Sequence, residues 1–157
     1  MILPRYHIAD SSIRGAGKGL FLDEIVAAGR VITAPDRIDR TFRHAEITAS
    51  PELSAQFHAS ARWFEDYYTL SPDWPDECYI NHSFTPNGLW HLGFVFALAE
   101  LPAGTEITVD YRHLLPPGQA EDFVDSVTGE IIAGLSWSES LASSTHALAR
   151  LLDTTHS

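Results

Sequence analysis

The chain has 157 residues, 45% of them hydrophobic, and a formal net charge of −11. This length suits one domain, and the acidic balance argues against nucleic-acid binding, because phosphate contacts need clustered Lys and Arg. No apolar run approaches the ~20 residues of a membrane span, and the N-terminal residues lack a signal-peptide pattern. The only cysteine, Cys78, excludes an intramolecular disulfide and a multi-cysteine zinc site. We therefore expect a cytoplasmic protein without a metal, whose acidic surface either suits basic protein partners or serves solubility alone.

The first third of the chain predicts short strands separated by turns. Three glycines between residues 15 and 19 precede the apolar residues 20–22. A hairpin is expected from strands over 24–26 and 31–32, because Ala28-Gly29 supplies a turn between them.

Residues 35–48 are polar and Arg-rich, which indicates a loop. Ser50-Pro51-Glu52 is a helix-start signal, with Ser as N-cap and Pro at the first helical position. Apolar residues then recur at helical spacing through Phe64, which predicts an amphipathic helix of about three to four turns.

The second half begins with a nearly continuous apolar run, residues 93–99, which is typical of a strand buried on both faces. After a turn, the alternation over 107–111 predicts a second strand. The tail contains a hairpin at Thr128-Gly129 and a final helix capped by Ser138. We expect the buried stripe of that helix to be Leu141, Thr145, Leu148 and Leu152. The tail either folds over the domain or pairs with a second subunit.

Three segments, far apart in sequence, carry the residues that point to a function. They are IRGAGKGLF (13–21), YINHSFTPN (79–87) and GTEITVDY (104–111). Their order and spacing resemble those of SET-domain protein-lysine methyltransferases, over residues 4–111 with a gap of low similarity between 35 and 67.

The resemblance implies a mostly β fold, the SET-domain β-clip, with short strands in several small sheets and a pseudoknot-like core. The SET domain is then residues 1–115, with a variable insert at 35–70 that carries one helix. Residues 116–157 form a C-terminal extension that holds the last helix and is a candidate lid for the cofactor.

The resemblance also implies an activity, the transfer of a methyl group from S-adenosylmethionine to a lysine amine of a protein. Tyr111 would be the catalytic tyrosine, and Asn81 and His82 would bind the cofactor.

The glycine-rich segment has its own physical rationale. Glycines adopt positive φ and let the backbone approach a ligand, so the exposed peptide groups of this loop suit an amino-acid-like cofactor. The cofactor-binding residues predicted here are Ala16, Gly17, Lys18 and Gly19. An ordinary glycine turn is the alternative, whereas a Rossmann or P-loop fits poorly, because no strand leads through these glycines into a helix.

A lysine channel needs a dry aromatic wall, which lowers the pKa of the amine by disfavouring its ammonium form. The channel residues predicted are Tyr68, Tyr79 and Trp90, with Tyr67 and Phe94 as further aromatics near the motifs. The alternative for each is ordinary core packing.

The sequence also departs from the family pattern. Cys78-Tyr79 stands where many members have an arginine, Phe84 replaces a common cysteine, and residues 33–35 lack a frequent tyrosine. No cysteine follows Cys78, so the zinc module that closes many family sites is missing. Trp137, with residues 123–135 before it, is the candidate for a lid that stacks on adenine; a helix-packing or dimer contact is the alternative.

The leading hypothesis is therefore an active lysine methyltransferase whose substrate is a protein, with basic proteins favoured by charge. A catalytically silent SET-like module that binds a peptide or protein is the main alternative, and a small-molecule methyltransferase is a third. The protein would be a monomer, or a homodimer through the C-terminal helix.

Overall fold

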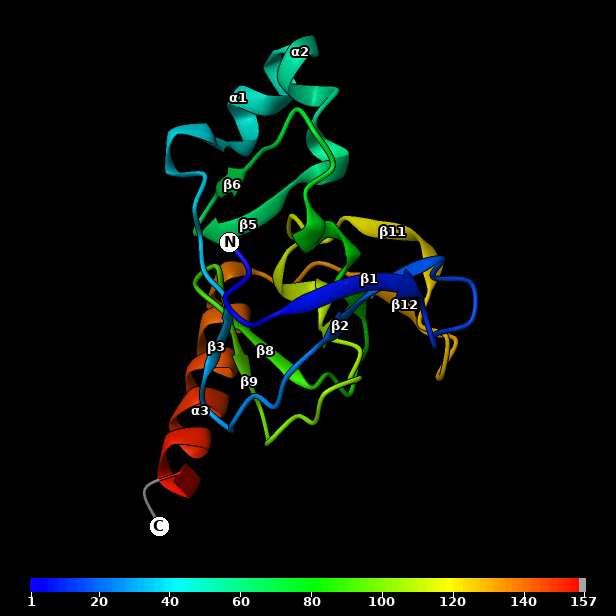
Figure 1. Ribbon diagram of the computed structural model, residues 1–157. Helices are drawn as coiled ribbons and strands as arrows, with labels where there is room; N and C mark the ends of the chain where they lie inside the picture. The colour runs from blue at the N-terminus through cyan, green and yellow to red at the C-terminus, as the bar shows by residue number, and fades with distance from the viewer. Residues whose placement is uncertain (156–157) are drawn as a thin grey trace.

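The computed structural model describes residues 1–155, which form small β-sheets, short helices and one long C-terminal helix (Figure 1). Within these residues there are five sheets, each of two or three strands. The predicted fold class, mostly β with several small sheets and a C-terminal helix, is confirmed. No helix in the described part of the chain is long and apolar enough to span a membrane.

The core lies between a hairpin and a three-stranded sheet. Strands β1 (Tyr6–Asp10) and β2 (Lys18–Leu22) pair antiparallel, and β3 (Val31–Thr33), β9 (Phe94–Ala97) and β8 (Gly88–His91) follow in that order. Buried side chains of these strands pack with two from residues 107–109 in one apolar cluster: Leu20, Leu22, Ile32, Val95, Ala97, Ile107 and Val109.

The hairpin predicted between residues 24–26 and 31–32 is wrong. Val26 bridges to Leu101, and Val31 pairs with Phe96. The two segments each pair with chain some 70 residues away, because the apolar strand β9 and the segment after it offer more buried area than a two-stranded ribbon does.

Strand β7 (Asn81–His82) pairs in parallel with β10 (Thr108–Val109), which joins two of the sequence motifs. Strand β10 is shorter than predicted, since Tyr111–His113 form a 3₁₀ turn. Asp110 ends the strand there, because its side chain accepts a hydrogen bond from the Arg112 amide at 3.0 Å.

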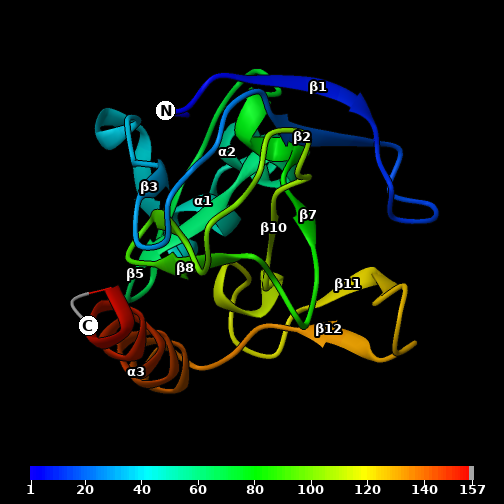
Figure 2. The same cartoon turned by 60° about the horizontal axis from the view of Figure 1, so that its bottom comes forward.

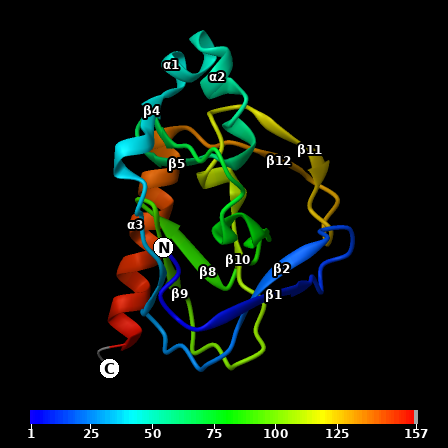
Figure 3. The same cartoon turned by 45° about the horizontal axis from the view of Figure 1, so that its top comes forward.

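The insert forms a separate lobe at one end of the molecule, opposite the C-terminal end of α3 (Figures 1 and 3). Its elements are β4 (Thr41–Arg43), α1 (His44–Ala49), α2 (Pro51–Ser54), β5 (Ala61–Phe64) and β6 (Tyr67–Thr69), with the sheet order β4-β6-β5. Further 3₁₀ turns lie at Ile38–Arg40, Phe57–Ala59 and Asp76–Tyr79.

Two predictions for this lobe are wrong. A helix, α1, lies within the segment expected to be a loop, and the helix that begins after Ser50 ends at Ser54. The apolar residues thought to form a helical stripe serve different elements. Phe57 packs against a small core around Ile47 and Tyr68, whereas Phe64 belongs to strand β5. A short apolar pattern is compatible with the periodicity of a helix and with that of a strand. Here the pairing of β5 with β6 determined that residues 61–64 form a strand.

The C-terminal extension forms a hairpin, β11 (Ala120–Val124) and β12 (Ile131–Ala133), followed by α3 (Trp137–Thr155). Helix α3 lies beside β8 (Figure 2). Its cap is Ser136 rather than Ser138: the Ser136 hydroxyl accepts from the Glu139 amide at 3.3 Å, and Glu139 accepts from the Ser136 amide at 3.0 Å.

The buried face of α3 also differs from the predicted stripe, because it carries Ser140, Ser144 and Leu151. Ser140 hydrogen-bonds His113 at 2.7 Å, and Ser144 hydrogen-bonds His91 at 2.9 Å. The two buried serines are thus hydrogen-bonded to histidines on the facing elements. Helical periodicity of apolar residues does not predict a buried face of this kind.

Candidate functional site

A cavity of about 1050 Å³ brings the three sequence motifs together. Its wall includes the glycine-rich loop between β1 and β2, strand β7, the Tyr111 turn and residues 121–126 of the C-terminal hairpin. The glycine-rich loop and that hairpin lie on the same side of the molecule and face each other (Figure 2). The cavity is therefore built from both the predicted SET segment and the extension.

The glycine-rich loop lines the cavity through residues 13–16 and 18. Gly15 and Gly17 have φ values of 85° and 75°, and a Cβ at either would meet no atom within 4 Å. The loop thus keeps open space beside its peptide groups, as a ligand-binding loop requires. The Lys18 ammonium bonds Asp10 at 2.6 Å, so its charge is already paired outside the loop.

Gly17 and Gly19 are not at the cavity wall. Gly19 is buried in β2, where a Cβ would collide with the Glu106 carboxylate. Gly19 was predicted to bind the cofactor, but in the structure this position requires glycine because a side chain would not fit beside Glu106.

The Glu106 carboxylate ties the loop to the core. It accepts hydrogen bonds from the Ser11 hydroxyl at 2.6 Å, the Ser12 amide at 2.8 Å and the Asn81 side-chain amide at 2.9 Å, and also from the Ser12 hydroxyl. Burial raises the pKa of Glu106, but these donors together outweigh it and the pKa is lowered. The Asn81 side chain also donates to the Lys18 carbonyl at 2.9 Å, so it holds the loop in place.

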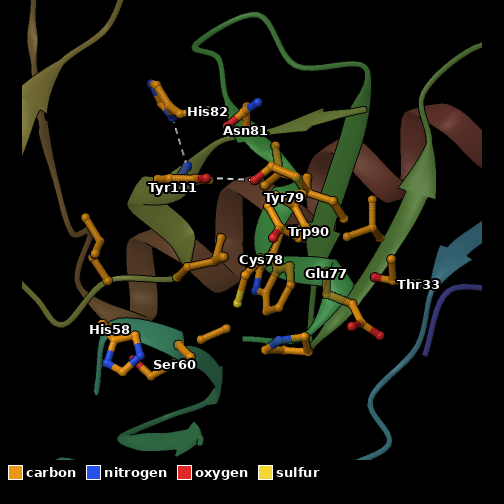
Figure 4. A pocket seen from close by; sticks show the side chains of 18 of the residues that line it. Thr33, His58, Ser60, Glu77, Cys78, Tyr79, Asn81, His82, Trp90 and Tyr111 are labelled. Atoms are coloured by element: carbon orange, nitrogen blue, oxygen red, sulfur yellow. Dashed lines mark hydrogen bonds between the residues drawn. The ribbon is translucent and has the colours of Figure 1, made fainter. Parts of the chain in front are cut away.

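Tyr111 lies at the centre of the site (Figure 4). Its hydroxyl donates to the Ile80 carbonyl at 2.7 Å, and its amide donates to Nδ1 of His82 at 3.1 Å. Burial raises the pKa of the phenol, and the negative charge of Glu121 raises it further. Tyr111 is therefore a neutral phenol whose proton points at a carbonyl, which leaves its oxygen lone pairs free to accept.

His82 is buried and neutral, because burial lowers its pKa. Since Nδ1 accepts from Tyr111, Nε2 carries the proton. That nitrogen has no hydrogen-bond partner, and its nearest charged neighbour is Oδ1 of Asp125 at 3.6 Å.

The hairpin side of the cavity differs from the predicted lid. Phe123 approaches the Tyr111 ring, with 6.4 Å between ring centroids, and lines the cavity. Trp137 does not line it and instead begins α3. In the described structure, the part of the predicted lid that reaches the cavity is therefore the hairpin and not Trp137.

Among the predicted channel aromatics, Tyr79 and Trp90 line the cavity on the side of the Tyr111 hydroxyl (Figure 4). Tyr68 does not, since it is fully buried against Ile47 and Leu70 in the insert lobe. Tyr67 and Phe94 also lie outside the cavity wall.

Three aromatic residues at the cavity were not predicted: His58, Trp63 and Trp74. Trp74 stacks on His58, with 5.8 Å between centroids and 5° between planes, and meets Tyr79 edge-on at 6.3 Å. For Trp74 the available sequence signal is its place between Pro72 and Pro75, a pattern that indicates turns and does not by itself predict a cavity residue.

Cys78 lines the cavity, but burial raises the pKa of its thiol to about 11. The thiol is therefore protonated near neutral pH and is a poor nucleophile. Among residues 1–155, no group of three or more His, Cys, Asp or Glu side chains could hold a metal ion.

Comparison with known proteins agrees with this geometry. The family model described as SET domain matches residues 17–112, more than half of the chain, and this segment carries Asn81, His82 and Tyr111. No curated protein sequence matches the chain. The family match, together with the meeting of the three motifs at one cavity, shows that the chain belongs to the SET domain family.

Proposed function

We propose that this protein is an S-adenosylmethionine-dependent protein-lysine N-methyltransferase, an activity typical of SET domains. The observation that carries the proposal is the cavity in which the glycine-rich loop, Asn81-His82 and the Tyr111 hydroxyl meet. A module that only binds peptides has no need of a glycine-rich loop and a tyrosine lone pair in one cavity.

The residues present fit the cofactor. The cavity of about 1050 Å³ is at the upper end of the roughly 300–1,000 Å³ of small-molecule sites, which leaves room for a cofactor and a lysine side chain. The open space beside Gly15 lets a ligand approach the peptide groups of the loop, which suits the carboxylate and amine of an amino-acid moiety. The unpartnered Nε2 of His82 is a buried donor that a ligand acceptor would satisfy. When bound, S-adenosylmethionine supplies a methyl group already activated by its sulfonium.

Tyr111 would orient the attacking amine. Because its proton is committed to the Ile80 carbonyl, its oxygen can accept an N–H bond from a neutral lysine amine and direct the nitrogen lone pair toward the methyl. Because the phenol and carbonyl dipoles are fixed before the reaction, they stabilise the transition state without having to reorganise during methyl transfer.

The lysine must be neutral to react. At pH 7 this costs about 4–5 kcal/mol for an ordinary lysine, whose pKa is about 10.4. Tyr79 and Trp90 supply the apolar wall that excludes water from the amine, and desolvation favours its neutral form.

The proposed substrate is a protein, since the cavity is open to the surface and a net charge of −11 attracts lysine-rich partners. Within this proposal the protein acts in the cytoplasm, and residues 116–157 serve as an extension whose hairpin closes the cofactor site.

The first experiment is calorimetric titration of S-adenosylmethionine into the full chain, followed by transfer of labelled methyl groups to lysine-containing proteins. Tyr111→Phe should bind the cofactor within about threefold of wild type and lose at least roughly 100-fold in transfer rate. Tyr6→Phe is the matched control, because it removes a tyrosine hydroxyl that bonds Asp76 at 2.7 Å away from the cavity wall.

Other outcomes favour the other candidates. A folded protein that binds no cofactor but captures peptides would be a silent SET-like module. Cofactor binding with no transfer to any protein would favour a small-molecule substrate.

A further inference from the structure

Glu121 is a carboxylate in an unusual position. It lies on β11, outside the family segment 17–112, is partly buried, and lines the same cavity as Tyr111. Within the described residues it has no hydrogen-bond or ion-pair partner. Burial and the neighbouring Asp122 raise its pKa, which shows that its surroundings oppose the negative charge and do not compensate it.

The strand that carries Glu121 is held against the catalytic region by two contacts. Phe123 packs edge-on to Tyr111 at 6.4 Å, with 78° between ring planes. The buried Asp125 side chain lies 3.6 Å from His82 and accepts bonds from the Val127 and Thr128 amides at 3.1 and 2.7 Å. Glu121 is therefore in a defined place at the cavity, near enough to Tyr111 for its charge to oppose ionisation of the phenol.

We propose that Glu121 binds the ammonium group of the incoming lysine as it enters the cavity, before the amine releases its proton to solvent and reacts as a neutral nucleophile at Tyr111. This inference rests on the proposed function and names the residue that selects a cationic side chain. An unpaired carboxylate in a partly desolvated cavity is unfavourable until a cation reaches it, and a charge-assisted bond there is stronger than one on the surface. The aromatic walls at Tyr79 and Trp90 accept the alkyl part of the lysine, whereas a neutral side chain of the same length would leave Glu121 unpaired.

The test compares two small probes that share a four-carbon side chain, of which only the first ends in an ammonium group. Nα-acetyl-lysine amide and Nα-acetyl-norleucine amide are titrated by NMR into the full chain saturated with S-adenosylhomocysteine. Wild type should prefer the lysine probe, and Glu121→Gln should weaken lysine binding by roughly five- to tenfold while leaving norleucine binding unchanged. Glu130→Gln is the matched control, since it removes an exposed carboxylate of the same hairpin that lies outside the cavity wall.

The inference is overturned if Glu121→Gln keeps the wild-type preference, if Glu130→Gln loses it equally, or if wild type has none. Titration of S-adenosylmethionine into the same three proteins separates this failure from failure of the proposed function. Wild type that binds no cofactor contradicts the methyltransferase itself. A Glu121→Gln protein that binds cofactor normally and no longer prefers lysine supports the role of Glu121.

Discussion

His82 and Asp125 join the family segment to the C-terminal extension. Nε2 of His82 lies 3.6 Å from Oδ1 of Asp125, and their side chains are only 4% and 3% exposed. On its other side, His82 accepts the Tyr111 amide at 3.1 Å. One imidazole thus contacts both the turn that carries the tyrosine and the hairpin that lines the cavity.

Removing the charge of Asp125 should therefore loosen the hairpin. In Asp125→Asn the one oxygen that accepts from the Val127 and Thr128 amides loses its negative charge, which weakens both bonds, and an NH2 group replaces the oxygen that faces the Nε2 proton of His82. We expect hydrogen-exchange protection of these two amides to fall by about tenfold, the effect of roughly 1.4 kcal/mol. Cofactor affinity should fall with it. Exchange rates as slow as those of wild type, or equal changes in Asp122→Asn, would contradict the anchoring role.

Glu106 should contribute to stability through the donors it collects. Glu106→Gln removes the charge and one acceptor, and we expect a loss of about 2 kcal/mol in the free energy of unfolding. Because the pKa of Glu106 is lowered in the folded state, this contribution is present above pH ~4.3 and disappears as the pH falls through the folded pKa. Urea denaturation measures it, with exposed Glu100→Gln as the control, which should change stability little.

The glycine-rich loop offers a matched pair of substitutions. Gly15 and Gly104 both have φ of 85° and no neighbour within 4 Å of a Cβ, but only Gly15 lines the cavity. Alanine costs about 1–2 kcal/mol in this left-handed conformation at either site. We expect Gly15→Ala alone to weaken S-adenosylmethionine binding, by roughly tenfold, in calorimetric titration. Equal affinities in the two variants would argue that the loop does not hold the cofactor.

Cys78 should resist alkylation in the folded protein. With a pKa of about 11, roughly 0.1% of the thiol is ionised at pH 8, compared with about a quarter of an ordinary cysteine. Mass spectrometry after iodoacetamide treatment should show labelling about two orders of magnitude slower than in urea-unfolded protein, and faster labelling as the pH rises toward 11. Rapid labelling of the folded chain at pH 8 would mean that the thiol is not buried as described.

Stability should decrease on mild acidification. Burial lowers the pKa of His82, His91 and His113, so the folded state favours their neutral forms. Below pH ~6.5 the unfolded chain binds more protons, and the free energy of unfolding falls until the folded pKa values are passed. Urea denaturation at pH 7.5 and 5.5 should show the loss, and His113→Gln should reduce it, whereas exposed His146→Gln should not. Stability that is constant or rises toward pH 5.5 would contradict the buried neutral state.

Much of the site was accessible from the sequence. Asn81, His82 and Tyr111 were identified by the motifs that surround them, and the structure brings them to one cavity. Tyr68 was predicted as a channel aromatic and Trp137 as a lid over adenine, and neither lines the cavity. An aromatic residue type indicates that the side chain will be buried, but it does not indicate which surface the side chain will pack against.

The amino-acid sequence by itself determined the family, the mostly β class and the positions of the glycine-rich loop and the Asn-His and Asp-Tyr motifs, because these depend on local residue types and their order. Only the tertiary structure decided which strands pair, which face of α3 is buried and which part of the extension reaches the site. Those outcomes depend on contacts between segments distant in sequence, such as His113 with Ser140 and His82 with Asp125. Pairing energy between such segments overrides the local periodicity on which any sequence prediction depends.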